Sequence, residues 1–376
     1  MDKNILVVAR WPLGGIRTYM RYMFSHFPGG FKITLLAAST QENTALQQDV
    51  EKYGALLKLV HVKGTRDFAS TVFRELCRNR YNLIISQGFV SAVSVYFANL
   101  LFRLPHMVTI HGIVEPQYLE GRFEGLKRWM LGRVLSAITV LYGVSHGILE
   151  HLYSEFPSLK NKGPQPLVIL NGIEPADFDL LPADPIKLRE TLKIKEEIFL
   201  FGFFGRFMPQ KGFDLVIEAV DLLQKRHSLL KFAVVAVGSG DYIREYQITI
   251  RKKQLESFFY FFPFQPLVHH LYPQVDVVVM PSRWEACPLL PMEVLSMGVP
   301  LIASNCIGTR EVIADTPVHV IEPDNIEQLV QAMQNSLIEN DILSFKKFST
   351  TARRRYDVQY SANQMVDFIN NQLVLR

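Results

Sequence analysis

The sequence is poor in cysteine, contains no long apolar run and has little net charge. Three widely spaced cysteines, Cys77, Cys287 and Cys306, give neither a disulfide framework nor a zinc-binding pattern. No stretch of about 18 residues is apolar and free of charge, so we expect no transmembrane helix. The start of the chain lacks the apolar core and cleavage site of a secretion signal, and residues 5–9 instead predict a strand. These absences favour a cytoplasmic protein.

The charges are distributed unevenly along the chain. The net charge is +4, but residues up to Glu174 contain 19 Lys+Arg against 12 Asp+Glu, and the remainder contains 21 against 24. A basic first half indicates an anionic partner or surface, or else ordinary variation in surface charge. No histidines, cysteines and acids are spaced as metal ligands, so we expect no metal and no other cofactor. We also expect no nucleic-acid partner.

Apolar runs that predict strands alternate with amphipathic stretches that predict helices, such as 16–27 and 68–78. In a chain of 376 residues, this alternation is typical of two or three α/β domains with parallel sheets and helices on both faces. The predicted strands are 5–9, 33–37, 57–61, 83–86, 107–110, 138–143, 198–204, 232–237, 258–262, 276–280, 300–303 and 318–321.

Proline and glycine gather between the two halves, from Gly163 to Pro185. They predict a linker between two Rossmann-like domains that face each other across a cleft. We place the domains at 1–174 and 175–355, followed by a C-terminal segment at 356–376. Residues 360–375 of that segment have helical periodicity, which does not determine where the helix packs.

Two glutamates follow the predicted strand 276–280. Glu285 lies in the following loop, and Glu293 lies eight positions later, at or near the start of a helix. Open α/β sheets bind ligands at the carboxyl ends of their strands, and an unpaired carboxylate is costly to bury. The pair therefore indicates a polar ligand, although a helix N-terminal acid beside a surface acid has the same pattern.

Two cations bracket a glycine-containing turn after the predicted strand 198–204. Arg206 offers a planar fork suited to phosphate, and Lys211 offers a compact point charge beside it. Together they could hold a pyrophosphate and stabilise it as a leaving group, while two solvated loop cations are the simpler alternative. Their place at a strand end in the same half as the glutamates favours phosphate binding.

Two weaker signals follow strands of the first half. Gly14-Gly15 precedes a predicted helix, where glycine lets the backbone approach an anion, but it is not the full G-x-G-x-x-G pattern and a simple turn also fits. His111 could hydrogen-bond a substrate hydroxyl, although a lone histidine is more often structural. Ser145 and Ser282 lie outside any G-x-S-x-G motif, so a serine hydrolase is not indicated.

Together these motifs resemble a retaining glycosyltransferase of family 4, of the group 1 type, with the two-domain GT-B fold. The glutamate pair is the most specific element, and the turn from Arg206 to Lys211 comes second. The resemblance spans most of the chain and also includes 109–112, 143–145, 171–173, 297–303 and 308–311.

The resemblance implies that the second domain binds a nucleotide-activated sugar, for which a UDP-sugar is our preferred guess. Arg206 and Lys211 would hold the diphosphate and assist its departure. Glu293 would accept hydrogen bonds from the ribose, and Glu285 would face the transferred sugar. Transfer would proceed with retention at the anomeric carbon, without a metal ion and without a protein nucleophile.

The resemblance also implies several further contacts. Gly15 and the backbone amides of Leu289 and Leu290 would approach the phosphates. Phe264 lies where such enzymes flank the base, and His111 would contact the sugar. The last helix would return to the first domain. The sequence departs from the family pattern at Ala286-Cys287-Pro288 and, after Gly-Gly, at Ile16-Arg17-Thr18, where an acidic residue is common.

The acceptor, a glycan or lipid-linked glycan, should bind the first domain. Residues 118–134 interleave four basic residues with aromatic and aliphatic ones, including Trp129. Such a helix either lies in a membrane interface, here at the inner face of the plasma membrane, or forms an ordinary surface helix. Two other functions stay open: a nucleotide-sugar epimerase of GT-B fold, and a catalytically silent nucleotide-sugar-binding protein.

Overall fold

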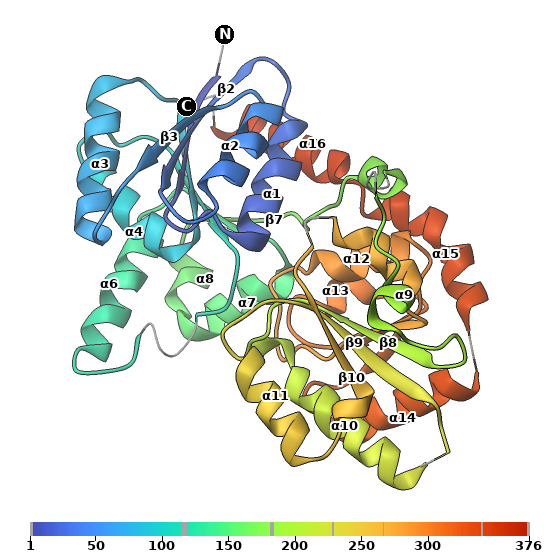
Figure 1. Cartoon of the computed structure of the whole chain (residues 1–376). Helices are drawn as coiled ribbons and strands as arrows, with labels where there is room; N and C mark the ends of the chain where they lie inside the picture. The colour runs from blue at the N-terminus through green and yellow to red at the C-terminus, as the bar shows by residue number, and fades with distance from the viewer. Residues whose placement is uncertain are drawn as a thin grey trace. The chain divides into compact units, whose positions relative to one another are not determined.

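The computed structural model describes residues 3–114, 119–180, 184–227, 229–265, 267–339 and 341–373. The chain forms two compact units, which we call unit 1 (Met1–Gly172 with Val358–Arg376) and unit 2 (Ile173–Asp357) (Figure 1). The chain thus passes between units after residues 172 and 357, where the sequence placed the boundaries at 174 and 355.

Unit 1 is built on a parallel sheet of seven strands in the order β3-β2-β1-β4-β5-β6-β7. Its strands are β1 (Lys3–Ala9), β2 (Phe31–Ala38), β3 (Leu56–Val60), β4 (Leu83–Gln87), β5 (His106–Ile110), β6 (Val140–Gly143) and β7 (Gln165–Val168). Its helices are α1 (Gly14–Ser25), α2 (Asn43–Lys52), α3 (Thr65–Arg78), α4 (Gly88–Asn99), α6 (Glu124–Ser136), α7 (His146–Glu155), α8 (Ser158–Lys162) and α16 (Val358–Phe368), which continues as a π-helical turn, Ile369–Leu373.

The edge strand β7 lies in a stretch that the sequence predicted as linker. It pairs in parallel with β6, from Val140 opposite Gln165 to Gly143 opposite Val168. Pro166 made this segment look like a connection, but an edge strand tolerates proline because one of its sides needs no ladder donor. The linker prediction is therefore wrong for this stretch, and residues 181–183 of the predicted linker lie outside the described residues.

The C-terminal helix α16 belongs to unit 1, where it contacts α1. Ser361 Oγ donates a hydrogen bond of 2.8 Å to the carbonyl oxygen of Leu170, and the His26 and Gln359 side chains are hydrogen-bonded at 2.8 Å. Met365 is buried in the core. Residues 374–376 of the predicted C-terminal segment lie outside the described residues.

Unit 2 is built on a parallel sheet of six strands in the order β10-β9-β8-β11-β12-β13. Its strands are β8 (Phe199–Phe204), β9 (Phe232–Gly238), β10 (Phe259–Pro263), β11 (Val277–Met280), β12 (Leu301–Ser304) and β13 (His319–Ile321). Its α-helices are α9 (Leu188–Leu192), α10 (Phe213–Arg226), α11 (Ile243–Lys252), α12 (Leu289–Ser296), α13 (Arg310–Ile313), α14 (Ile326–Ile338) and α15 (Ile342–Arg355). Single-turn 3-10 helices include Pro209–Lys211, and a longer one spans Val268–Gln274.

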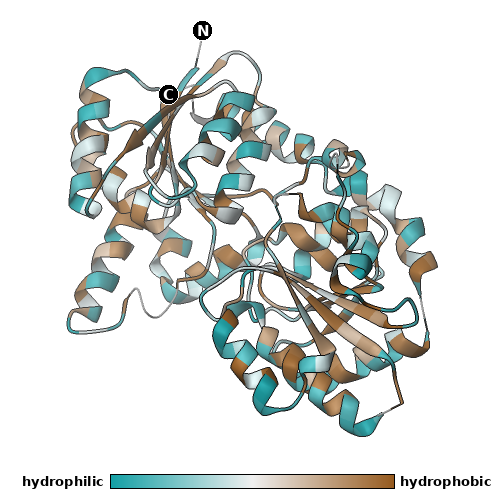
Figure 2. Cartoon of the chain, viewed as in Figure 1, coloured by the Kyte–Doolittle hydropathy of each residue, from teal (hydrophilic) through white to brown (hydrophobic). Residues whose placement is uncertain are grey.

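The central strands of unit 2 are hydrophobic along their length because helices cover both faces of the sheet (Figure 2). An aromatic cluster extends this core into the loop after β8. The rings of Phe203, Phe207 and Phe213 pack with centroids 4.7 to 5.8 Å apart. Burial of Phe207 and Phe213 therefore anchors both ends of the segment that carries Lys211.

In both sheets the strand order reverses at one point, between β1 and β4 in unit 1 and between β8 and β11 in unit 2. Connections leave such a pair of strands toward opposite faces, which opens a crevice at their carboxyl ends where ligands bind. The strand order therefore predicts ligand-binding sites in the loops after these strands. The predicted α/β class with two parallel sheets is confirmed.

Candidate active site

The loops after β8 and β11 bring Lys211 and Glu285 into contact. Lys211 Nζ lies 2.7 and 2.9 Å from the two carboxylate oxygens of Glu285, which is only 5% exposed. The Ser282 hydroxyl donates to Glu285 Oε1 at 2.7 Å, and the Glu285 amide donates to the Ile307 carbonyl at 3.0 Å. These partners offset the desolvation cost of burying the carboxylate. The reversal point of unit 2 thus carries a preformed charged centre.

Two glycines allow the backbone to pack closely around this centre. Gly212 has a φ of +68°, and a Cβ there would lie 2.2 Å from the Pro281 carbonyl oxygen. Gly308 has a φ of +76°, and its Cβ would lie 2.3 Å from the carbonyl oxygens of Glu285 and Ala286. Only glycine fits these positions without displacing the main chain. The conformation of Glu285 is therefore set by loops on both of its sides.

Arg206 lies on the same loop as Lys211 but is exposed. Within the described ranges, its side chain has no hydrogen bond or ion pair with another residue. The backbone on either side is fixed, because the Gly205 amide donates to Val237 and the Phe207 amide donates to Ser239. In the part of the chain that the structure describes, Arg206 is therefore an unpaired cation that lies close to Lys211 in the sequence.

Glu293 lies in the second turn of α12, further into the helix than the sequence predicted. Its Oε2 accepts a hydrogen bond of 2.6 Å from the Tyr272 hydroxyl. Tyr272 is fully buried, and its ring meets that of Phe204, the last residue of β8, with centroids 4.9 Å apart. Glu293 is thereby tied to the same strand end as the Lys211 loop.

Leu289 and Leu290 are the first two residues of α12. Pro288 precedes them without a side-chain cap, and Pro291 follows in the first turn. Because both prolines lack an N–H, Leu289 and Leu290 supply the amide donors of this helix end. Phe264 is 62% exposed and directly follows β10, which is separated from β8 by β9.

In unit 1, the ends of β4 and β5 bring Gln87 and His111 together. His111 Nε2 lies 2.6 Å from Gln87 Oε1, and the ring packs edge-on against Tyr19 at 4.8 Å. Burial lowers the pKa of His111 to about 3, so the ring is neutral at neutral pH. An amide oxygen only accepts, so Nε2 carries the proton. Gly15 is exposed in the first turn of α1, after β1.

Sequence reasoning missed three residues that hold these groups in place. Tyr272 lies in a 3-10 helix that has no apolar period, and Gln87 is the last residue of a buried strand, where its side chain has no distinguishing motif. Arg283 forms ion pairs with Asp214 and Asp324. Only Arg283 could have been suspected, since it lies two positions before Glu285.

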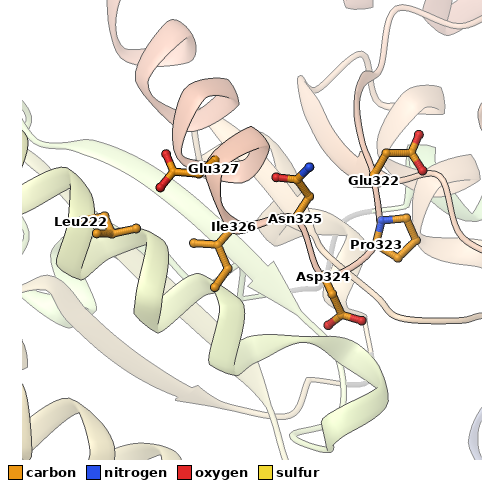
Figure 3. A pocket seen from close by; sticks show the side chains of 7 residues that line it. All are labelled: Leu222, Glu322, Pro323, Asp324, Asn325, Ile326 and Glu327. Carbon is orange, nitrogen blue, oxygen red and sulfur yellow. The ribbon is translucent and has the colours of Figure 1, made fainter.

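One shallow pocket lies beside the end of β13 and the start of α14 (Figure 3). Its polar side chains already have partners in the fold: Asp324 binds Arg283, Asn325 caps α14, and Glu327 binds Arg226. We assign it no ligand. Among the described residues, no group of three or more His, Cys, Asp or Glu side chains could hold a metal ion.

Part of the chain matches a known protein family. Residues 185–355 match the family described as glycosyl transferases group 1. An uncharacterized glycosyltransferase of Methanocaldococcus jannaschii is 30% identical over 177 residues, which are 45% of this chain and 43% of that protein. The chain therefore spans less than half of this relative. The O-antigen biosynthesis glycosyltransferase WclY of Escherichia coli is 27% identical over 66% of this chain and 68% of its own.

A solved structure has the same fold over nearly the whole chain. The Anabaena protein HepE, in complex with UDP and glucose, aligns with a TM-score of 0.81 and 18% identity, covering 98% of this chain and 100% of that one. The chain thus has the GT-B fold, and its region 185–355 matches the group 1 glycosyltransferases. The resemblance predicted from the motifs is confirmed at this level.

Proposed function

We propose that the protein transfers a sugar from a nucleotide-sugar, preferably a UDP-sugar, to a glycan or lipid-linked glycan. We further propose that transfer retains the anomeric configuration and needs no metal ion. The observation that carries this proposal is the Lys211–Glu285 centre at the reversal point of unit 2, inside the group 1 region. The UDP and glucose bound by HepE support the donor class, and the name of WclY supports a glycan acceptor.

The charged residues of unit 2 contact different parts of the donor. Lys211 and the exposed Arg206 neutralise the diphosphate as it leaves. Glu285, released from Lys211, accepts hydrogen bonds from hydroxyls of the transferred sugar. Glu293 accepts hydrogen bonds from the ribose, and its Tyr272 partner keeps the carboxylate oriented.

Residues with smaller roles complete the proposed site. The amides of Leu289 and Leu290 donate to phosphate oxygens, as helix N-termini do, and the exposed amide of Gly15 is the corresponding phosphate-binding candidate of unit 1. Phe264 offers its exposed ring to the base. His111, being neutral, hydrogen-bonds the sugar rather than contributing a charge.

The reaction needs no nucleophile from the protein. The bond between the anomeric carbon and the diphosphate breaks while the acceptor oxygen bonds to the same face of that carbon. The acceptor proton passes to a phosphate oxygen of the leaving nucleoside diphosphate. Electrostatic stabilisation of that leaving group and precise positioning of the acceptor account for the rate acceleration.

Nucleotide binding by the purified full-length chain tests the donor site. A donor present at about 100 times its Kd should stabilise the wild type by about 2.7 kcal/mol, which a thermal-shift panel of nucleoside diphosphates and nucleotide-sugars would detect. The double variant Lys211→Met with Glu285→Gln removes both charges together, so no buried carboxylate is left unpaired, and it should lose the shift. Lys225→Ala breaks an ion pair of 2.8 Å on α10 and is the matched control. A flat response of the wild type to every compound would refute the donor site.

Product analysis separates transfer from the alternatives. With donor and acceptor, we expect a new glycosidic bond at an unchanged rate when a chelator is added. An isomerised nucleotide-sugar formed without acceptor would favour the epimerase. Binding without either product would favour the silent binding protein.

We also propose that unit 1 docks on an anionic membrane at its cytoplasmic face. The helix α6 packs beside α4, and large apolar side chains on these two helices and the residues next to their ends are exposed. These are Phe97, Leu100, Leu101, Phe123, Leu126, Trp129 and Met130. Exposed basic residues alternate with them, namely Arg103, Arg122, Lys127 and Arg133. Apolar anchors among basic residues fit an anionic bilayer surface. Residue 118, which began the predicted helix, lies outside the described residues.

Liposome sedimentation tests this docking. The full chain should sediment with vesicles containing phosphatidylglycerol at low salt and be released at high salt, because counterions screen the attraction. The variant Trp129→Ala with Arg133→Glu should stay in solution. Trp11→Ala removes another exposed tryptophan of unit 1 and is the control. Equal sedimentation of all three proteins would exclude α6 as the membrane contact. None of the helices in the described ranges is long and apolar enough to cross a bilayer.

A further inference from the structure

Arg283 links three segments around the donor site. Its guanidinium forms a two-pronged contact with Asp214, with Nη1–Oδ1 at 3.0 Å and Nη2–Oδ2 at 2.6 Å. Its Nε donates to Asp324 Oδ1 at 2.7 Å, and its Nη1 also donates to the carbonyl oxygen of Pro209. Planar contacts of this kind fix direction as well as distance, which a lysine cannot do.

The three partners lie on the segments that frame the charged centre. Pro209 begins the 3-10 turn that ends with Lys211, and Asp214 is in the first turn of α10. Asp324 lies between β13 and α14, where Figure 3 shows its side chain. Arg283 itself lies two positions before Glu285. One side chain thus connects the loop after β8, the loop after β11 and the segment after β13.

Backbone contacts reinforce the same connection. The Arg283 amide donates to the Gln210 carbonyl at 2.8 Å, and the Gln210 side chain donates to the Trp284 carbonyl at 2.9 Å. The two loops are therefore joined at successive residues, 209 and 210 on one side and 283 and 284 on the other. Such a ladder fixes the register of one loop against the other.

The two ion pairs between these loops have opposite polarity. In one, the loop after β8 supplies the cation, Lys211, and in the other it leads to the anion, Asp214. A diphosphate attracts Lys211 and would take it from Glu285. Arg283 is held by two carboxylates, Asp214 and Asp324, and by the Pro209 carbonyl, so its contacts stay closed while the first pair opens.

We propose that Arg283 is a positioning residue of the donor site, which holds the Lys211 and Glu285 loops in register while Lys211 exchanges Glu285 for the diphosphate. This inference rests on the proposed function for its ligand. Its structural part, the coupling of the two loops, does not depend on that function.

A purely structural role for Arg283 makes a different prediction, and unit 2 contains a matched comparison. Arg226 forms the same two-pronged contact with Glu327, with both distances at 2.8 Å. That pair joins α10 to α14, and Glu327 is visible in Figure 3. Partly exposed pairs of this kind contribute little to stability, so losing either should lower the Tm only slightly.

The experiment compares full-length Arg283→Gln, Arg283→Lys and Arg226→Gln with the wild type. For Arg283→Gln we expect the Kd for UDP to rise about 10-fold and kcat to fall on the order of 100-fold, the effect of displaced catalytic groups. Arg283→Lys keeps the positive charge but lacks the planar guanidinium, so its Kd and kcat should lie between those of Arg283→Gln and the wild type. Arg226→Gln should match the wild type in both quantities.

Hydrogen exchange of the free proteins supplies a readout without any nucleotide. Amides of residues 209–212 and 283–286 should exchange faster in Arg283→Gln than in Arg226→Gln and the wild type. Unchanged exchange there, or a UDP affinity of Arg283→Gln equal to that of Arg226→Gln, would overturn the inference. A wild type that binds no nucleotide would refute the proposed function instead, while faster exchange would still establish the coupling of the loops.

Discussion

His106 is the first residue of β5 and His111 follows its last residue, and both rings are neutral near neutral pH. The His106 ring is buried and lies 2.8 Å from the Ser86 hydroxyl, and burial lowers the pKa of each histidine to about 3. Neither ring can be charged near neutral pH without leaving its place. The two residues differ in position, because His106 begins the strand inside the core and His111 follows its carboxyl end.

Acid should therefore destabilise unit 1 through His106. In the unfolded chain a histidine titrates near pH 6.5, so as the pH falls from about 6.5 toward 3 the unfolded state binds a proton that the folded state does not. The stability fully present above pH 6.5 is lost by up to about 1.4 kcal/mol per pH unit. Urea unfolding at several pH values should show a shallower dependence for His106→Gln. His61→Gln, at an exposed position, should keep the wild-type slope. Identical slopes for all three proteins would contradict this.

The residues of the site could be predicted only in part. Strand ends and charge types sufficed to select Arg206, Lys211, Glu285 and Glu293. The partners of these groups were not predictable, because a contact such as Tyr272 to Glu293 depends on how a 3-10 helix packs, and no periodicity marks that. The direct pairing of Lys211 with Glu285 was missed for the same reason.

At the scale of elements, buried parallel strands are the most predictable because both of their faces are apolar. The twelve predicted strands all exist, with ends shifted by a residue or two. The strand β7 was missed because its proline resembled a linker. The tail also followed its pattern, since Met365 and Ile369 are buried as their spacing predicted.

Packing of α16 should contribute to the stability of unit 1 and not to nucleotide binding. Met365 is 1% exposed, so Met365→Ala should destabilise unit 1 by about 2–4 kcal/mol through the cavity it leaves. Urea unfolding would measure this loss. Gln364→Ala, at the neighbouring exposed position, should be nearly neutral. A Met365→Ala protein with wild-type stability would show that α16 does not depend on this contact.

At the scale of the whole molecule, both units contain a parallel sheet whose strand order reverses at one point, but the two units differ in net charge. Unit 1 has 20 Lys+Arg against 12 Asp+Glu, and unit 2 has 20 against 24. The alternation of strands and helices was enough to predict two sheets. That the loops of Lys211 and Glu285 lie close together was predictable as well, because a parallel sheet places the carboxyl ends of its strands at one edge.

Binding of a UDP-sugar should leave a localised footprint on the chain. Hydrogen exchange with and without donor should show protection at 205–212 and 282–293 in unit 2, which follow β8 and β11. The segments that enter the strands of unit 2 at the opposite edge, near 230 and 257, serve as internal controls and should exchange at unchanged rates. Protection confined to those entering segments would mean that the ligand binds at the amino ends of the strands, and it would contradict the prediction.

The pairing of Lys211 with Glu285 has a consequence for selectivity. Any anion that approaches Lys211 competes with a carboxylate already bound to it at 2.7 Å. Inorganic phosphate can replace that carboxylate but leaves Glu285 buried without its cation. Under the proposed function, a nucleotide-sugar would offer hydroxyls to Glu285 at the same moment, so both groups would exchange partners together. The internal ion pair would then favour ligands with two complementary ends over small anions such as inorganic phosphate.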